Sequence, residues 1–317
     1  MAISAGKIAY TLFHQPLTWW LDRRDAMAGR RGEIEMRTAA MALKPLTLAR
    51  WGLETPPVRF LTGARFVHQT LFCAQSFAWA CGSHFRFEVY NDSTLTSENI
   101  STLQTTLPGA IVPAADKVTA RLDAVLPVDR YPHLRRMRDA HPLMRKLLDL
   151  HAGQSGPSLY LDSDMLFFAR PPLLCDWLRK PAGEFHMRQI GDALVANRAE
   201  LASRFGLALT EGVNSGILAL DDDGFDWPLL ERAAAAMTDD ERAHKWAEQT
   251  LFAVHVSHRH SHPLPSSDYH LCHGREDFGG ATPPLRHYLH KSKSIYTARE
   301  WRHWQNRAAA APTGSPA

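Results

Sequence analysis

Two acidic residues, Asp162 and Asp164, follow an apolar run near the middle of the chain. Residues 158–161 have the composition of a buried strand, and the two acids come directly after it. Because side chains alternate along a strand, both carboxylates are expected to project to the same side. Two like charges about 4 Å apart repel by on the order of 4 kcal/mol at an effective dielectric of 20, so a cation is needed between them. The pair therefore predicts a site for a hard divalent ion, Mn²⁺ or Mg²⁺, which usually also holds substrate phosphates.

The elements that position these acids are predicted to alternate between strands and helices. Residues 58–61 are β-prone, residues 66–81 carry apolar side chains at a spacing near 3.6, and residues 85–90 alternate between apolar and polar. A helix at 142–151 then precedes the strand at 158–161. This order predicts an α/β fold with a mostly parallel central sheet, in which ligands bind beyond the carboxyl ends of the strands.

Two more strands are expected, at residues 215–220 and around residues 252–256. Pro56 and Pro57 disfavour helix and indicate a boundary. We therefore expect a basic, partly helical N-terminal extension over residues 1–55. We also expect a C-terminal tail over residues 297–317 that is disordered from Arg307 onward.

Composition excludes several classes of protein. The 317 residues are 45% hydrophobic and 22% charged, which fits a globular chain with a sizeable core. The net charge of +3 is too small to indicate a nucleic-acid-binding protein, and we predict no nucleic-acid partner. Four cysteines without CxxC spacing favour a reducing compartment, the cytoplasm. No apolar window is long enough for a membrane-spanning helix.

The N-terminal extension carries the basic excess. Residues 1–59 hold nine Lys or Arg against five Asp or Glu, a net +4. Within them, Trp19 and Trp20 precede four arginines, Arg23, Arg24, Arg30 and Arg31. The favoured interpretation is a solvated helix that packs both tryptophans on the core. The alternative is a peripheral contact of this helix with the inner face of a membrane.

The segment Asp162-Ser163-Asp164 resembles the Asp-x-Asp motif of nucleotide-sugar-dependent glycosyltransferases of the A-type fold. Further segments resemble the retaining family that includes glycogenin and bacterial lipopolysaccharide galactosyltransferases. Residues 213–218 are similar to that family's Phe-Asn-Ala/Ser-Gly-Val-Leu segment, and residues 248–249 to its Asp-Gln pair. Residues 287–293 are similar to its His-Phe-x-Gly-x-x-Lys segment.

The resemblance covers residues 56–296 and implies one Rossmann-like nucleotide-diphospho-sugar transferase domain. In it, residues 56–165 form the nucleotide-binding half and residues 166–296 the acceptor and sugar half. The implied metal ligands are Asp162, Asp164 and His287, with His290 as the alternative to His287.

The resemblance also implies roles in donor binding and catalysis. Lys146, Asp162, Ser163, Ser215, Gly216 and Lys293 match donor-binding positions, and Gln249, Glu248 and Asn214 match positions near the reacting sugar carbon. From their place after the first two strands, Asp92, Thr62 and Gly63 are added as candidate contacts to the nucleoside; ordinary turn chemistry explains them equally well.

The function predicted from these residues is transfer of a sugar from a nucleoside diphosphate donor to an unknown acceptor, which could be a glycan, a lipid or a protein. A uridine diphosphate sugar is the favoured donor, and Mn²⁺ or Mg²⁺ is the expected cofactor. Two alternatives stay open. One is a metal-dependent phosphatase of the haloacid-dehalogenase type, although its Asp-x-Asp pair normally follows the first strand. The other is a catalytically silent carbohydrate-binding protein.

Overall fold

The structure is a computed structural model, and it describes residues 15–48 and 55–310, with only the backbone of residues 15–19. The end of the predicted C-terminal tail, residues 311–317, lies outside the described residues. The helices of the described part are α2 (Gln15–Met41), α3 (Val67–Cys81), α4 (Ser97–Thr106), α5 (Ala115–Val125), α6 (Pro132–Ala140), α7 (Met144–His151), α8 (Pro172–Arg179), α9 (Arg198–Phe205), α10 (Trp227–Ala236), α11 (Asp239–Ala243), α12 (Ala247–His258), α13 (Ser292–Ile295) and α14 (Trp301–Ala310). None of them is long and apolar enough to cross a membrane.

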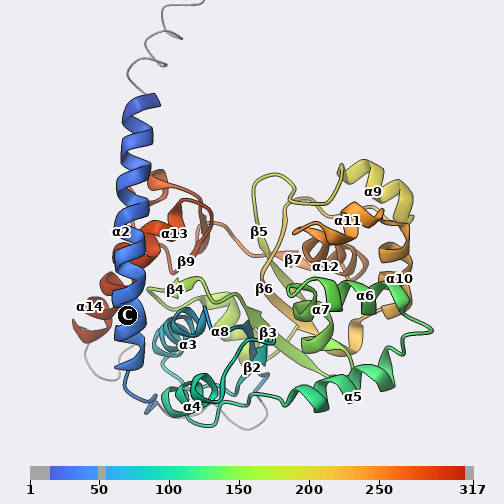
Figure 1. Ribbon diagram of the computed structural model, residues 1–317, viewed down its shortest axis with the longest axis horizontal. Helices are drawn as coiled ribbons and strands as arrows, with labels where there is room; N and C mark the ends of the chain where they lie inside the picture. The colour runs from blue at the N-terminus through green and yellow to red at the C-terminus, as the bar shows by residue number, and fades with distance from the viewer. Residues whose placement is uncertain (1–14, 49–54, 311–317) are drawn as a thin grey trace, which may run out of the picture.

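A six-stranded sheet forms the centre of the molecule (Figure 1). Its strands lie in the order β2 (Phe87–Asn91), β1 (Val58–Thr62), β3 (Pro157–Leu161), β6 (Val213–Asp221), β5 (Phe185–Arg188) and β7 (His262–Pro263). Five of these strands run in one direction and β6 runs in the other, because β6 pairs antiparallel with both β3 and β5. The start of β6 therefore lies beside the carboxyl end of β3.

A second, three-stranded sheet lies next to this edge. It has the order β4 (Met165–Phe167), β9 (Leu285–Tyr288) and β8 (Tyr269–Cys272). Only three residues separate the end of β3 in the large sheet from the start of β4 in the small one. The loop that carries the two acids is therefore the direct connection between the sheets.

The large sheet separates two hydrophobic cores, as the alternation of side chains on β3 shows. Leu159 and Leu161 are buried in the core that includes α2, α3, α8 and α14. Tyr160 is buried in the opposite core, with α5, α6, α7, α10 and α12. This three-layer arrangement confirms the predicted α/β fold with a mostly parallel sheet and a helical N-terminal extension.

The predicted strand around residues 252–256 is wrong. These residues belong to α12, in which every residue from Ala247 to Ser257 is buried. Val254 and Val256 have high strand propensity, but a helix that is buried on all sides also reads as a continuous apolar run. The length of the segment distinguishes the two, because twelve residues are too many for a short core strand.

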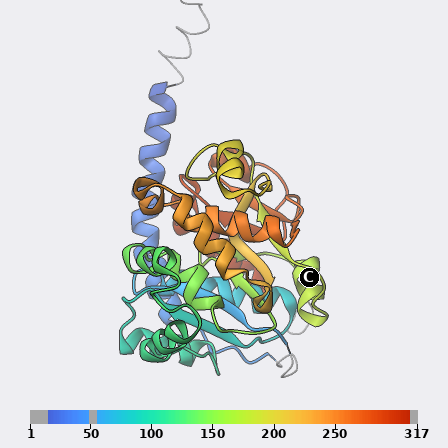
Figure 2. The ribbon, with the colours of Figure 1, turned by 90° about the vertical axis from the view of Figure 1, so that its right-hand side faces the viewer.

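Helix α2 runs along one side of the molecule and extends beyond it (Figures 1 and 2). Two glycines set how closely it packs: a Cβ on Gly29 would lie 2.8 Å from Cα of Ser294, and one on Gly32 only 2.2 Å from the Thr297 carbonyl oxygen. The prediction that both tryptophans pack on the core is wrong for Trp20, which is 53% exposed, because the glycine face of α2 is the one that packs. The Trp19 side chain lies outside the described residues.

The chain beyond residue 296 continues as helix. The π-helical turn η4 (Tyr296–Glu300) leads into α14, and Trp301 and Trp304 of α14 are buried against Phe72. Residues 307–310, which the sequence placed in a disordered stretch, form the last turn of this helix. Four consecutive alanines from Ala308 on favour helix, which explains the difference.

The buried His186 of β5 predicts a loss of stability in acid. Its side chain is fully buried, with Nδ1 at 3.1 Å from Ser261 Oγ, and burial lowers its pKa to about 4. The unfolded chain takes up this proton near pH 6.5, so stability is lost as the pH falls from 6.5 toward 4. At about pH 5 this one group is expected to cost about 2 kcal/mol.

The variant His186→Asn keeps a polar atom near Ser261 and removes the titration. Urea unfolding at about pH 7 and about pH 5 should show that the wild-type protein loses about 2 kcal/mol more than the variant over this interval. Equal losses in the two proteins would show that His186 does not carry this acid sensitivity.

Candidate active site

The two acids lie where the large and small sheets meet. Asp162 follows the last residue of β3, and its backbone N–H donates to the Gly216 carbonyl oxygen at 2.8 Å. Asp164 precedes β4, and its carbonyl oxygen accepts a hydrogen bond from the Tyr288 N–H at 3.0 Å. Both ends of the loop are thus fixed by backbone hydrogen bonds, which holds the carboxylates in place.

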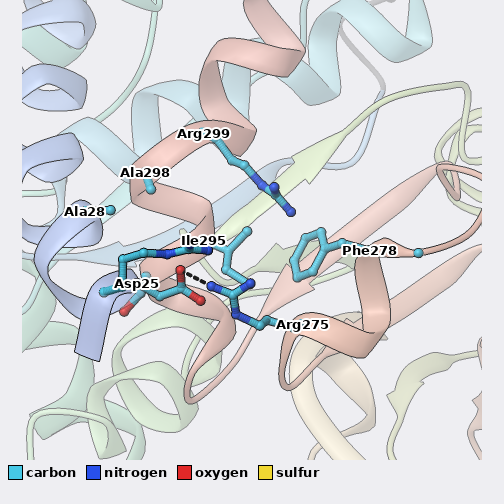
Figure 3. A pocket seen from close by; sticks show the side chains of 10 residues that line it. Asp25, Ala28, Arg275, Phe278, Ile295, Ala298 and Arg299 are labelled. Carbon is cyan, nitrogen blue, oxygen red and sulfur yellow. Dashed lines mark hydrogen bonds and ion pairs between the residues drawn. The ribbon is translucent and has the colours of Figure 1, made fainter. Parts of the chain in front are cut away.

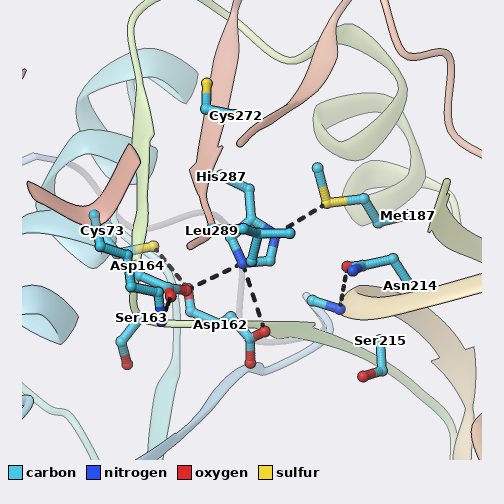
Figure 4. A network of polar contacts seen from close by, with 12 residues as sticks. Cys73, Asp162, Ser163, Asp164, Met187, Asn214, Ser215, Cys272, His287 and Leu289 are labelled. Atoms are coloured by element: carbon cyan, nitrogen blue, oxygen red, sulfur yellow. Dashed lines mark hydrogen bonds and ion pairs between the residues drawn. The ribbon is translucent and has the colours of Figure 1, made fainter. Parts of the chain in front are cut away.

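A histidine reaches the acids through the pairing of β4 with β9. The antiparallel register places His287 opposite Met165, the residue after Asp164. His287 Nε2 lies 3.1 Å from Asp164 Oδ1 and 3.7 Å from Asp162 Oδ2 (Figure 4). Ligand atoms of the three side chains all lie within 4.8 Å of one another. The structure therefore gathers two carboxylates and an imidazole at one point.

This donor set fits Mn²⁺ or Mg²⁺, the expected cofactor. Carboxylate oxygens are the ligands that both ions prefer, and the imidazole adds one nitrogen donor. The other ring nitrogen, Nδ1, lies 3.4 Å from the Met187 sulfur, which only accepts hydrogen bonds (Figure 4). A metal on Nε2 would require the ring proton on Nδ1, beside this sulfur; without a metal, a proton on Nε2 is donated to Asp164 Oδ1 at 3.1 Å.

The second candidate histidine lies elsewhere. His290 has a positive φ of 48° and lies in the turn after β9, where its ring stacks on His273 at 5.8 Å between centroids. Among the described residues that could share a metal with Asp162 and Asp164, the cluster contains His287 and not His290.

The two histidines give a direct test of this assignment. His287→Ala is expected to weaken Mn²⁺ affinity about a hundredfold, since a metal ligand is lost, whereas His290→Ala is expected to leave it nearly unchanged. Titration calorimetry with Mn²⁺ measures both, and His290→Ala serves as the matched control. The opposite ranking would contradict the site described here.

Lys146 of α7 connects the acids to the start of β6 and to α12. Its Nζ is buried and lies 3.4 Å from Asp162 Oδ1, 3.1 Å from Glu248 Oε1 and 3.0 Å from Ser215 Oγ. Burial alone lowers the pKa of Lys146, but Asp162 and Glu248 outweigh it, so the pKa is raised and the ammonium stays charged. The side chain is therefore a fixed positive charge behind the acids.

Glu248 is buried beside this ammonium. Burial raises the pKa of Glu248 to about 7, and the attraction of Lys146 offsets only part of that effect. Its Oε2 accepts a hydrogen bond from Ser215 Oγ at 3.2 Å. Glu248 thus holds both Lys146 and the start of β6.

The start of β6 packs directly against the cluster of Asp162, Asp164 and His287. A Cβ on Gly216 would lie 2.4 Å from His287 Cε1, so only glycine leaves room for the imidazole. Asn214 Oδ1 accepts from the Gly216 N–H at 2.9 Å, and Asn214 Nδ2 donates to Gln189 at 3.1 Å. Gln249 Oε1 accepts from the Ser215 N–H at 3.3 Å. The three residues of β6 are therefore fixed next to the acids.

Lys293 of α13 supplies a second positive charge from the opposite side. Its Nζ lies 2.8 Å from Asp164 Oδ2, yet its side chain is 54% exposed. Burial alone raises the pKa of Asp164, but His287 and Lys293 outweigh it and hold this pKa well below its usual range. Asp164 is therefore ionised at neutral pH, and Lys293 is free to turn toward a bound anion.

These side chains line one cleft of about 380 Å³. Most residues predicted for the site contribute to it: Lys146, Asp162, Ser163, Asp164, Asn214, Ser215, Gly216, Glu248, Gln249, His287 and Lys293.

Asp92, Thr62 and Gly63 do not line the cleft. Asp92 Oδ1 accepts from the backbone and side chain of Thr94, which is ordinary turn chemistry, and Thr62 Oγ1 is buried 2.7 Å from Thr70 Oγ1.

Several residues of the site had no motif to reveal them. Tyr160 donates to Asp162 Oδ1 at 2.5 Å, and alternation along β3 places the two side chains on one face. Phe66 and Trp246, which are 39% and 36% exposed, lie at the cleft with Lys245. The position of Trp246 just before Glu248 and Gln249 is the one signal that could have indicated it.

Known proteins were compared with the chain by sequence and by structure. No family model and no curated protein matches the sequence. Similar solved structures include the galactosyltransferase LgtC with donor and acceptor sugar analogues (14% identity, TM-score 0.48, 81% of this chain and 96% of LgtC covered). Mouse xyloside xylosyltransferase 1 has 10% identity and a TM-score of 0.47, and the match covers 74% of this chain and 97% of the xylosyltransferase. Core-mannan synthase A of Aspergillus fumigatus, in its Mn/GDP form, has 10% identity and a TM-score of 0.40, and the match covers 68% of this chain and 72% of the synthase. These similar structures are glycosyltransferases, the class of enzyme that the sequence resembles.

Proposed function

We propose that this protein is a metal-dependent glycosyltransferase that transfers a sugar from a nucleoside diphosphate sugar, a uridine diphosphate sugar in particular, to an acceptor. One observation carries the proposal: Asp162, Asp164 and His287 converge in a cleft that is bordered by the half-exposed side chain of Lys293. Two acids and an imidazole suit Mn²⁺ or Mg²⁺, and a bound ion with an adjacent lysine suits a diphosphate.

The chemistry of the proposed reaction explains this arrangement. When the bond between the anomeric carbon and the diphosphate breaks, negative charge grows on the departing phosphate. A divalent ion on Asp162, Asp164 and His287 would neutralise part of that charge. Lys293 would donate hydrogen bonds to the phosphate oxygens. Its ammonium pairs with Asp164 and would turn from that carboxylate to the phosphate.

Other residues of the chain keep the site in its reactive geometry. Lys146 binds Asp162, Glu248 and Ser215 simultaneously, so it orients the metal-binding carboxylate and is itself too buried to follow a substrate. The proposed role of Lys146 is therefore positioning, combined with a favourable field for the diphosphate.

The sugar is proposed to lie beside the start of β6 and α12. Positive charge develops at the anomeric carbon as the bond breaks, and polar oxygen atoms on that side stabilise it. Asn214, Glu248 and Gln249 offer such oxygens at the cleft. We therefore assign the nucleotide to residues 56–165 and the sugar and acceptor to residues 166–296, since the cleft is lined from both ranges.

The cysteines of the chain fit a reducing compartment, and we propose the cytoplasm. The described cysteines, Cys73, Cys81, Cys175 and Cys272, are all free and buried.

A donor screen tests the proposed function. Calorimetry with a panel of nucleoside diphosphate sugars, with and without Mn²⁺, is expected to show donor binding that requires the metal. Slow release of the nucleoside diphosphate should accompany it, and proton NMR of the product would give the anomeric configuration. Hydrolysis of simple phosphate esters would instead indicate a phosphatase, and donor binding without turnover would indicate a silent carbohydrate-binding protein.

A further inference from the structure

Helix α2 exposes a straight row of large apolar side chains. Trp20, Met27, Ile34 and Met41 recur every seven residues and are 53%, 53%, 69% and 56% exposed. Seven residues are close to two helical turns, so the four side chains form one stripe about 30 Å long. We call these four residues the outer stripe. It lies opposite the face of α2 that packs on the molecule, which includes Gly29, Gly32 and Met36.

Arginines flank the outer stripe on both sides. Arg23, Arg24, Arg30 and Arg31 are three or four residues from a member of the stripe, and all four are exposed. The Arg24 guanidinium lies 5.3 Å from the centre of the Trp20 ring. An apolar row with basic residues on each side is the pattern of a helix that lies in the surface of an anionic bilayer.

The acidic residues of α2 form ion pairs with other basic residues. Four acids lie within residues 20–41, and each forms an ion pair with another partner: Asp22 with Lys291, Asp25 with Arg275, Glu33 with Arg37, and Glu35 with Arg302. Three of these partners come from the C-terminal part of the chain, although the side chains of Asp22 and Glu35 stay 40% and 49% exposed. With four exposed arginines beside the outer stripe, the outward face has a net positive charge.

A basic pocket lies beside the same helix. Its volume is about 400 Å³, and Arg24, Arg275 and Arg299 line it together with one acid, Asp25 (Figure 3). Asp25 is already paired with Arg275. The pocket has a partly apolar wall that includes Phe278 and Ile295, so it can take a phosphate group with attached carbon chain.

We propose that α2 docks this protein on an anionic lipid bilayer, lying parallel to the membrane surface with the outer stripe inserted among the lipids. The flanking arginines and the basic pocket contact lipid phosphates. A second copy of the chain is a poorer occupant, because its arginines would face those of the first copy across the stripe. The proposal goes beyond glycosyl transfer and does not depend on it.

Vesicle co-sedimentation tests the proposal without any sugar donor. Wild-type protein is expected to bind vesicles that contain phosphatidylglycerol at least about tenfold more tightly than vesicles of phosphatidylcholine alone, and added salt should weaken the binding. Ile34→Asp and the double variant Arg30→Glu/Arg31→Glu should each lower the affinity about tenfold or more. Ile190→Asp is the matched control, since Ile190 is an exposed isoleucine as well but lies far along the chain from α2.

Thermal unfolding keeps the comparison valid, because exposed positions should change the melting temperature little. Absence of wild-type binding to anionic vesicles, or equal binding by wild type and Ile34→Asp, would overturn the proposal. Light scattering after size exclusion provides the third outcome: a wild-type dimer that Ile34→Asp converts to a monomer, with vesicle binding unaffected, would assign the stripe to an interface between copies.

Discussion

Asp164→Asn is expected to abolish metal-dependent donor binding while the protein stays folded. The variant loses the negative charge that pairs with His287 and Lys293 and that would bind the proposed divalent ion, and loss of such a partner typically costs about a hundredfold or more. The amide keeps the size of the side chain and the repulsion from Asp162 falls, so the protein should stay folded, with a melting temperature lowered by the loss of the ion pairs to His287 and Lys293. Calorimetry with Mn²⁺ and then with the donor measures the effect.

Asp129→Asn is the control for this variant. Asp129 is an exposed acid of a turn far from the cleft, and its replacement removes the same charge. Donor binding equal to wild type is expected from the control. If Asp164→Asn binds donor and Mn²⁺ as tightly as the control, the two acids are structural.

Lys146→Met is expected to have the largest effect on stability, together with loss of donor binding. The change leaves Asp162 and Glu248 next to each other without their buried cation. Breaking a buried ion pair by removal of one partner costs about 3–5 kcal/mol. Urea unfolding at neutral pH measures this loss, and calorimetry of the folded variant measures donor affinity.

A second substitution separates stability from function at this site. In Lys146→Met/Glu248→Gln the unpaired carboxylate is replaced by a neutral amide that can still accept from Ser215. Part of the lost stability should return at a pH well above 7, where Glu248 of the single variant is ionised and the amide of the double variant is neutral, whereas donor binding should stay weak. Wild-type stability of the single variant would contradict the buried network described here.

The local elements of the fold could be predicted because their signals are local. The 3.6-residue spacing from Phe66 gives α3, and Gly82 ends it with a left-handed φ of 63°. Strands β1 and β3 follow from short β-prone runs bounded by breakers. Since Asp162 comes directly after β3, the amino-acid pattern is enough to place the acids at a strand end.

The features that the sequence alone could not predict depend on tertiary packing. Helix α12 is buried on every side, so its sequence carries no amphipathic pattern to separate it from a strand. His287 meets the acids only through the register of β9 against β4, which no spacing in the sequence encodes. His287 was predicted as a site residue from the resemblance to a family, and not from the periodicity of the sequence.

The orientation of α2 could not be predicted from the hydrophobicity of its side chains. Hydrophobicity favours a buried Trp20, but Gly29 and Gly32 allow a closer approach of the backbone to η4 and therefore determine the packed face. Similarly, Thr62 ends β1 and Asp92 follows β2, yet the Thr62 hydroxyl pairs with Thr70 of α3 and the Asp92 carboxylate is used within its own turn. Position after a strand indicates a site only when the side chain has no closer partner.

Anomalous diffraction from crystals grown with Mn²⁺ and uridine diphosphate would locate both the metal and the nucleotide. One manganese peak is expected within about 2.3 Å of oxygens of Asp162 and Asp164 and of Nε2 of His287, with the diphosphate beside Lys293. A map in which the nucleotide occupies another cleft, or in which no manganese lies between these three side chains, would contradict the proposed metal-dependent donor site.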